Sequence, residues 1–520
     1  MNNRTTSSVK NVITAMVVNV INIGINFFSQ KVFINLMGIE YLGLNGLFSN
    51  ILTLLNIAEL GIGEAIVFHL YRPIAKNDKE KIKALMSFYK KAYNYIAIIV
   101  FGFGLILLPF IERFVGDITI KNVNLKIVYL LFLLQTVSSY VLTYKRSILY
   151  ASQKNYIINS IHLCYILLYN FLQLFVLFVY KNYYLYLTAK IISQIIENSI
   201  INIYVNKKYE FLKNTQNAKI DKEVEKDIFN RLKATFLHKI GAFLVNGTDN
   251  ILISKMDSVA TVGLYSNYYM IINAVTNLFS QVIYSTTASI GNLLTEKNDK
   301  KNFEVFNKIR FLNFYIATFT ATCILVIIQN FIKVWIGENY IFNIQVVVML
   351  VINYYQLMMR KTYDAFLNAA GICVENRFVP IAESVLNIVF SIIFYKVFGL
   401  VGIFMGTFFS GFALWAYSYP KFVYKKVLKK RYINYVKETL TYFCLFICIS
   451  GLTFLLSKFV QIDSSIANII ISAIIAVIIP NVIIYIIYHN SVNYKYFITL
   501  IKKIKIFNKR GDNNDKKQTI

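Results

Sequence analysis

Charged residues are scarce in this chain of 520 residues, and acidic residues are the scarcest of them. Asp and Glu number 26 against 54 Lys and Arg, and together the charged residues make up only 15% of the sequence. A soluble chain of ordinary composition carries about 25% charged residues. Hydrophobic residues reach 57%. The composition therefore excludes an ordinary soluble protein and favours a membrane protein.

Motifs for catalysis are also missing. The sequence has no GxSxG, HExxH, Walker A or CxxC pattern, which excludes an energy-coupled ATPase subunit within this chain. Its five cysteines suggest neither a pairing nor a metal site, since four fall in predicted membrane spans and Cys373 in a connection. We therefore expect no enzyme, no metal site and no cofactor, and we leave open the coupling of Na⁺ or H⁺.

Long apolar runs without charge are what the chain has instead, for example 92–111 and 467–488. About 20 helical residues cross a hydrocarbon core of about 30 Å, and a helix satisfies its own backbone groups there. We predict an all-α integral membrane protein with about fourteen spans. The predicted spans are 11–34, 43–70, 88–111, 124–144, 156–180, 182–205, 234–256, 262–290, 307–331, 341–360, 378–398, 400–423, 438–460 and 466–488.

Sequence echoes at a spacing of about 220 residues indicate an internal duplication. The pairs are YLGLNGLFSN from Tyr41 with TVGLYSNYYM from Thr261, KNDK from Lys76 with KNDK from Lys297, SILYAS from Ser147 with AFLNAA from Ala365, and Tyr180-Lys181 with Tyr395-Lys396. A repeat of this length has the scale of one six-helix half of a transporter. The predicted parts are an N-terminal six-helix lobe 1–206, a cytoplasmic linker 207–233, a C-terminal six-helix lobe 234–430, helices 13 and 14 in 431–490, and a basic cytoplasmic tail 491–520.

The excess of positive charge lies mainly in connections that share one side of the membrane. Examples are 72–91, 207–233, 421–437 and 502–517. The positive-inside rule then places both termini in the cytoplasm. The cations flank the spans and form no separate basic domain, so a nucleic-acid-binding role is excluded.

Polar residues recur in steps of three and four along three predicted spans, which predicts a hydrated cavity between the two halves. Asn26 lies on the first of these spans, Asn56 and Glu59 on the second, and Lys239, Asn246, Asp249 and Asn250 on the seventh. Helix–helix hydrogen bonding is an equal alternative for each uncharged member. Ionised groups are costly in a membrane, so Glu59, Asp249, Asp364 and Glu383 should be paired or should face water.

Cations near the helix ends have an alternative role. Arg146, Arg360 and Lys361 stand at predicted cytoplasmic helix ends, where reaching out to the interface is the simpler explanation. Arg310 is a further cation available to the predicted cavity. His69 and His162 lie near helix ends and are expected to make local hydrogen bonds.

Two segments resemble a known family. Glu40–Asp78, which reads EYLGLNGLFSNILTLLNIAELGIGEAIVFHLYRPIAKND, is similar to the helix 2 region of oligosaccharide repeat-unit flippases. These are polysaccharide biosynthesis proteins of the polysaccharide transport family, within the multidrug/oligosaccharidyl-lipid/polysaccharide exporter superfamily. GTDNILISKM, Gly247–Met256, resembles that family's helix 7. The predicted layout of six, six and two helices covers essentially the whole chain.

The resemblance implies a MATE-like pair of six-helix bundles that alternates access across a bacterial inner membrane. The cargo would be an undecaprenyl-pyrophosphate-linked oligosaccharide for O-antigen, capsule or exopolysaccharide, with a polymerase and glycosyltransferases as possible partners. In members with helices 13 and 14, these helices are thought to help form a groove for the lipid tail. On this basis Lys239 and Arg146 are candidate phosphate contacts, and Arg310, Arg360 and Lys361 could attract the headgroup. Asn26, Asn56, Asn246 and Asn250 suit sugar hydroxyls, Glu59 and Asp249 could hold a coupling cation, and Asp364 is a further cavity acid.

Three other functions remain open at this point. A cation-coupled multidrug exporter of the same superfamily typically has twelve helices, which disfavours it. A flippase for the peptidoglycan lipid precursor shares the fourteen-helix plan. A polysaccharide polymerase or ligase would need a large outward loop, and no predicted loop fits.

Overall fold

The protein is described by a computed structural model, in which two compact units are distinguished. The described residues are 2–55, 62–115, 120, 123–213, 220, 222–229, 248–372, 375–376, 378–460, 462 and 464–499. The units are Met1–Ser266 and Asn267–Ile520. All regular structure within the described residues is helical, as predicted.

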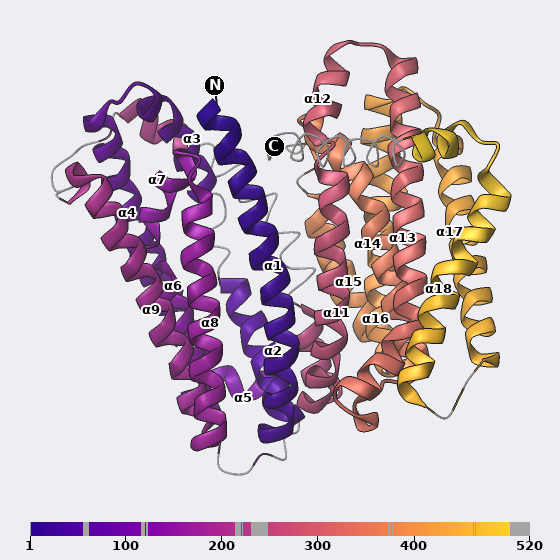
Figure 1. The fold of residues 1–520 in the computed structure, drawn as a ribbon, viewed down its shortest axis with the longest axis horizontal. Coiled ribbons are helices and arrows are strands. Elements are labelled where there is room, and N and C mark those ends of the chain that lie inside the picture. Colours follow the sequence, from indigo (N-terminus) through magenta and orange to yellow (C-terminus); the bar gives the residue numbers. More distant parts are fainter. Residues whose placement is uncertain are drawn as a thin grey trace, which may run out of the picture. The chain divides into compact units, whose positions relative to one another are not determined.

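The first unit is a bundle of long helices joined by short ones (Figure 1). Its helices are α1 (Asn2–Met37), α2 (Ile39–Leu55), α3 (Ile62–Ala75), α4 (Lys79–Leu107), α5 (Ile111–Phe114), α6 (Leu125–Tyr140), α7 (Arg146–Ala151), α8 (Asn155–Val179) and α9 (Tyr183–Lys208), with 3₁₀ turns η2 (Leu108–Phe110), η3 (Thr143–Lys145) and η4 (Glu210–Leu212). Helical segments 222–229 and 248–256 follow. The helix α1 packs along α8, α8 packs along α9, and α6 contacts α9, α4 and α2.

The second unit is built around its longest helix, α13. The helices are α11 (Val259–Tyr284), which begins in the first unit, α12 (Thr287–Thr295), α13 (Asp299–Trp335), α14 (Ile344–Ala369), α15 (Val379–Phe398), α16 (Leu400–Ser410), the π-helix η6 (Ala413–Val427), α17 (Tyr432–Phe459) and α18 (Ser465–Tyr488), with the 3₁₀ turn η5 (Glu338–Tyr340). The helix α13 packs against α14, α17 and α18, and α15 packs along α16 (Figure 1).

Nine helices within the described residues are long and apolar enough to cross a membrane. The other predicted spans fall on α2 with α3, on α9, on α11, on α14, and on the range 234–256, of which 248–256 is described. The helices α9, α11 and α14 have 26 residues each, which is about 39 Å of helix and long enough to span. Their lower hydropathy comes from polar residues such as Lys190 and Glu197 in α9.

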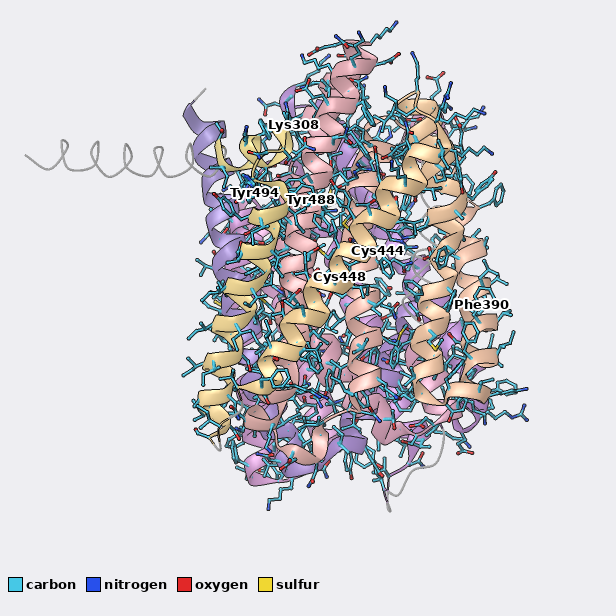
Figure 2. All side chains as sticks on the ribbon, turned by 90° about the vertical axis from the view of Figure 1, so that its right-hand side faces the viewer. Lys308, Phe390, Cys444, Cys448, Tyr488 and Tyr494 are labelled. Carbon is cyan, nitrogen blue, oxygen red and sulfur yellow. The ribbon has the colours of Figure 1, made fainter. Side chains whose placement is uncertain are left out.

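Large apolar side chains cover the outer faces of several helices, which is the arrangement that lipid favours. Phe103 on α4, Phe171 on α8 and Val397 on α15 are each more than half exposed. Figure 2 views the second unit from the side of α17, on which Cys444 and Cys448 are labelled, and both thiols are exposed and unpaired. The apolar outer faces of these helices are therefore suited to contact with the hydrocarbon of a bilayer.

Backbone conformation supports the internal duplication and corrects two of its register assignments. Residues with positive φ end helices at matching points of the two copies: Asn77 with Lys297, Gln153 with Gly371, and Lys181 with Gly399. The side chain of Asp78 caps α4, and that of Asn298 caps α13. The two residues of a pair are 220 positions apart in the first case and 218 positions apart in the other two. Matching the KNDK motifs at 221 was therefore wrong by one residue, and matching Lys181 with Lys396 was wrong by three.

The two copies also meet through equivalent glycines, Gly43 on α2 and Gly263 on α11, in a crossing inside the first unit. A Cβ on Gly43 would lie 1.9 Å from the carbonyl oxygen of Val259, and a Cβ on Gly263 would lie 2.3 Å from that of Ile39. Backbone atoms cannot yield as a flexible side chain can. Close approach of these helices therefore requires glycine at both positions.

We expect Gly43→Ala to lower stability by about 1–3 kcal/mol, because the added methyl group forces the two backbones apart. Gly102→Ala on α4 is the matched control. Its Cβ would meet nothing within 4 Å, so this change should raise stability by about 0.5–1 kcal/mol through helix propensity. Thermal unfolding of the purified protein in detergent measures both effects. A Gly43→Ala protein that melts at or above the wild-type temperature would contradict the crossing.

Candidate functional site

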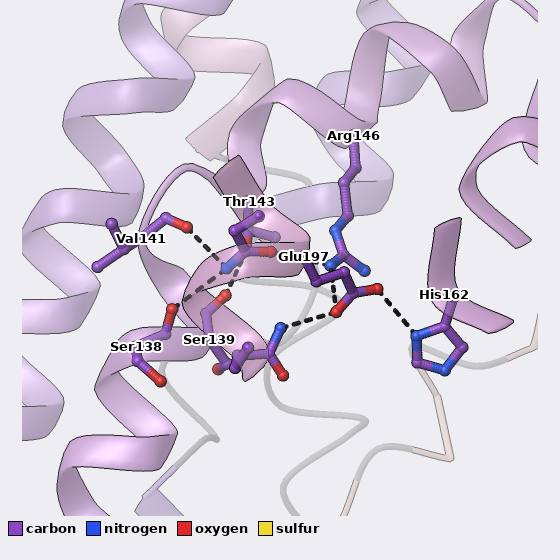
Figure 3. Close-up of polar contacts among 9 residues, drawn as sticks. Ser138, Ser139, Val141, Thr143, Arg146, His162 and Glu197 are labelled. Atoms are coloured by element: carbon purple, nitrogen blue, oxygen red, sulfur yellow. Dashed lines mark hydrogen bonds and ion pairs between the residues drawn. The ribbon is translucent and has the colours of Figure 1, made fainter. Parts of the chain in front are cut away.

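A buried carboxylate lies among the helices of the first unit. Glu197 on α9 has a side chain that is only 1% exposed. Its Oε2 atom lies 3.0 Å from a terminal nitrogen of Arg146, and its Oε1 atom lies 2.9 Å from Nδ1 of His162 (Figure 3). The side-chain amide of Gln194 donates a further hydrogen bond of 2.9 Å to Oε2. We call Glu197, Arg146 and His162 the Glu197 cluster.

The chain path around the end of α6 explains how Arg146 reaches this position. Leu142 has a φ of 63° and turns the backbone between α6 and η3, so that α7 starts at Arg146. The amide of Asn198 donates to the carbonyl oxygens of Ser138 and Val141, 3.2 and 2.8 Å away (Figure 3). Its oxygen accepts from the guanidinium of Arg146 at 2.9 Å. Asn198 thus donates hydrogen bonds to the free carbonyl groups at the end of α6 and holds the guanidinium of Arg146 in place.

The three side chains of the Glu197 cluster differ in exposure. That of His162 is 42% exposed, that of Arg146 is 18% exposed and that of Glu197 is 1% exposed. The imidazole stacks on the ring of Tyr165 at 5.4 Å, which holds it in place. The cluster is an ion pair of Arg146 and Glu197 to which His162 adds a second contact with the carboxylate.

A second feature of the first unit is a polar cavity between α2 and α6, of about 220 Å³. We call it the hydroxyl cavity. Its lining residues are Ser49, Leu52, Thr53, Phe132, Gln135, Thr136 and Ser139, none of which is charged. The hydroxyl of Thr53 donates to the carbonyl of Ser49 at 2.6 Å, and that of Ser139 donates to the carbonyl of Thr136 at 2.7 Å. Their oxygen lone pairs therefore remain able to accept hydrogen bonds.

The arginines that the sequence offered as headgroup contacts in the second unit are paired with carboxylates. Arg360 contacts Glu383, whose side chain is 5% exposed. Arg310 lies 2.5 Å from Glu438 and also contacts the hydroxyl of Tyr424. Ion pairing compensates most of the positive charge that an anionic cargo would meet at these two residues.

The remaining candidates have varied surroundings. Lys361 lies over the ring of Tyr284, 5.4 Å from its centre, and Asp364 accepts a 3.0 Å hydrogen bond from Tyr419. The amide of Asn26 donates to Asn22 at 3.2 Å, a helix-internal bond. Asp249 is buried, and the amide of Asn250 donates to the carbonyl of Gly46 at 3.2 Å. Asn56, Glu59, Lys239 and Asn246 lie outside the described residues.

Sequence reasoning missed Glu197 and misjudged the histidines. His162 binds Glu197 on another helix, and His69 lies 3.2 Å from Asp227 in the segment 222–229, so neither contact is local. Glu197 stands within a predicted span, which is itself a signal of a paired or functional group. Across the described residues, no group of three His, Cys, Asp or Glu side chains could hold a metal ion.

Comparison with known proteins places this architecture. The sequence model of the family described as "Polysaccharide biosynthesis protein" matches residues 8–290, which is more than half of the chain. The chain belongs to the polysaccharide biosynthesis protein family. Its long apolar helices mark it as a multi-pass membrane protein. Among curated proteins, no sequence relative matches the chain.

Solved structures share the fold of this family member at low sequence identity. An inward-facing multidrug resistance MATE transporter of the MOP superfamily is similar with a TM-score of 0.61 and 15% identity, over 77% of this chain and 94% of that one. The lipid II flippase MurJ, in an inward closed conformation, is similar with a TM-score of 0.59 and 14% identity, over 92% of this chain and 99% of that one. A MATE transporter of Vibrio cholerae has a TM-score of 0.55 and 14% identity, over 81% and 98%. The MATE/MurJ-like fold confirms the predicted fold class.

We expect Glu197→Gln to lower stability by about 3–5 kcal/mol, because it leaves Arg146, whose side chain is only 18% exposed, without its anion. Adding Arg146→Gln to this variant should recover part of the loss, since the unpaired charge is then gone. Glu210→Gln serves as the control, because the Glu210 side chain is 79% exposed and its removal should change little. Thermal unfolding of the four purified proteins tests the cluster. A Glu197→Gln protein as stable as the wild type would show that the ion pair contributes nothing to stability.

Proposed function

We propose that this protein moves an undecaprenyl-pyrophosphate-linked oligosaccharide repeat unit from the inner to the outer leaflet of a bacterial cell membrane. The observation that carries the proposal is the hydroxyl cavity, an uncharged polar space inside a unit of membrane-spanning helices. A sugar that crosses hydrocarbon must exchange its bonds to water for bonds to the protein. Membership of a family named for polysaccharide biosynthesis supports a lipid-linked sugar as the substrate class.

The chemistry of the hydroxyl cavity matches a sugar better than a phosphate. Hydroxyl oxygens whose own protons are already used act as acceptors, and a sugar offers hydroxyl donors to them. A phosphate group has no proton to spare and would need a cation, and none lines this cavity. Phe132 and Leu52 add an apolar wall on which the C–H face of a sugar ring can rest.

The pyrophosphate requires positive charge elsewhere along the route. Of the candidates, Arg146, Arg310 and Arg360 are compensated by carboxylates. Lys361 has no carboxylate partner among the described residues. We therefore rank Lys361 and Lys239 first as phosphate contacts and propose that Arg146 contributes when the Glu197 cluster opens.

Arg146, His162 and Glu197 come from α7, α8 and α9, so opening of the Glu197 cluster would require separate helices to move apart. Asn26, Asn250, Asp249 and Asp364 remain proposals for further contacts with sugar or cation. Both termini are proposed to be cytoplasmic, from the distribution of Lys and Arg.

The extent of the structural matches favours the flippase plan over a multidrug exporter. The lipid II flippase covers 92% of this chain, whereas the multidrug transporter covers 77%. The helices α17 and α18 extend the chain beyond a twelve-helix plan, and both are long and apolar enough to span. The peptidoglycan lipid precursor remains the alternative cargo, because it has the same chemical parts.

The decisive experiment measures the movement of lipid-linked sugar by the purified protein in liposomes, with undecaprenyl-pyrophosphate-N-acetylglucosamine as the probe. Gln135→Leu combined with Thr136→Val removes two hydrogen-bonding groups from the hydroxyl cavity. At about 1 kcal/mol for each bond, the affinity for the probe should fall about 30-fold.

Ser138→Ala is the matched control for this test. Ser138 lies on the same helix, is buried, and donates to the carbonyl of Gln135, but it does not line the cavity. It should leave transport near the wild-type rate. If the wild-type protein moves no probe, or if the double variant moves it as fast as the control variant does, the proposal fails.

A further inference from the structure

An apolar cavity of about 370 Å³ lies in the second unit, apart from the residues discussed above. Its walls come from α14, α16, η6 and α17 and include Tyr355, Phe408, Trp415 and Phe443. The volume falls within the range of about 300–1,000 Å³ found for small-molecule sites. We call it the aromatic cavity.

The mouth of the aromatic cavity is edged by side chains that face the surface of the unit. Phe412, Tyr432 and Leu440 line it and are 45, 53 and 56% exposed. Leu440 precedes Cys444, labelled on α17 in Figure 2, by one helical turn. These exposed residues are apolar or aromatic, so the neighbouring solvent is hydrocarbon, and an occupant can enter from the bilayer.

One end of the mouth is the start of α17, which favours an anion. This helix of 28 residues begins at Tyr432, and no side chain caps its first N–H groups. Uncapped amides and the helix dipole attract negative charge. Arg431, the residue at the cap position, is exposed and has no carboxylate partner among the described residues, and the same holds for Lys437 six residues further on. Nearby Lys426 and Lys429 are paired with Glu375 and Asp299.

The cavity also contains a polar group without a partner. The side chain of Trp415 is 8% exposed, lines the cavity, and its indole N–H has no hydrogen-bond acceptor. A buried donor left unpaired costs about 1–3 kcal/mol. An ester oxygen at the head of an acyl chain is an acceptor that would remove this cost.

From these features together we infer that the aromatic cavity binds an anionic phospholipid of the surrounding bilayer, with one acyl chain among the aromatic rings and the phosphate at Arg431 and the start of α17. The apolar volume is lined by the unpaired indole of Trp415 and by Tyr432, which follows the exposed Arg431 in the chain. A neutral sugar and a free phosphate both lack an acyl chain that could fill the apolar volume of the cavity. The inference does not depend on the cargo that the protein transports.

The chain provides its own reporter for this site, because it has only two tryptophans, Trp335 and Trp415. In a Trp335→Phe background, emission comes from Trp415 alone. Lipids with brominated acyl chains quench a tryptophan that they touch. The protein is reconstituted with increasing fractions of brominated phosphatidylglycerol, or of brominated phosphatidylcholine, in unlabelled phosphatidylcholine.

We expect phosphatidylglycerol to quench Trp415 at a mole fraction about fivefold lower than phosphatidylcholine, the effect of one basic residue on an anionic lipid. Arg431→Gln should abolish this preference. Lys458→Gln, at the other end of the same helix, should preserve it. A second reporter is Leu440→Trp in a background that lacks both native tryptophans, Trp335→Phe with Trp415→Phe, and it should report the same preference. Leu455 is similarly exposed on α17 but lies outside the cavity, so Leu455→Trp in that background should show no preference.

Three results would overturn the inference. Equal quenching by the two lipids would mean unselective contact with the bilayer. An unchanged preference in Arg431→Gln would remove the anion site. Relief of phosphatidylglycerol quenching by undecaprenyl phosphate at a lower mole fraction than by unlabelled phosphatidylglycerol would assign the cavity to a polyprenyl lipid.

Discussion

A carboxylate buried among membrane helices must be neutralised by a partner that the protein supplies, because hydrocarbon offers neither water nor counter-ions. Glu197 meets this requirement with Arg146 and His162, and Glu383 meets it with Arg360. Each pair joins side chains from different helices. The placement of α7, α8 and α9 in the first unit, and of α14 and α15 in the second, is thereby tied to charge as well as to packing.

The same constraint shapes the route that an anionic cargo can use. Arginines held by carboxylates present little net charge, so they cannot act as a continuous cationic lining. The hydroxyl cavity carries no charge at all. Under the proposed function, the sugar and the pyrophosphate would therefore be recognised at separate places.

The two copies are more alike in backbone conformation than in the chemistry of their side chains. Three pairs of helix ends, marked by positive φ, occur at equivalent points of the two copies, and Gly43 meets its own equivalent, Gly263. At the spacing of 218 that holds near these sites, however, Asp364 replaces Arg146 and Trp415 replaces Glu197. The second copy thus has an aromatic ring, beside an apolar cavity, where the first has its buried acid. Equivalent positions of the two copies thus have side chains of different chemistry.

The sequence by itself determined the membrane class, the helical fold, the duplication and most of the spans, because these depend on the length and polarity of local runs. It also indicated Arg146 and the acids as candidates, since charge inside a span is conspicuous. Only the tertiary structure decided which charges pair, that His162 meets Glu197, and that the KNDK motifs differ by one residue in register. Those outcomes depend on contacts between side chains 23 or more residues apart in the chain and on φ angles at the helix ends. A pattern along one helix contains no information about the side chain that faces it from another.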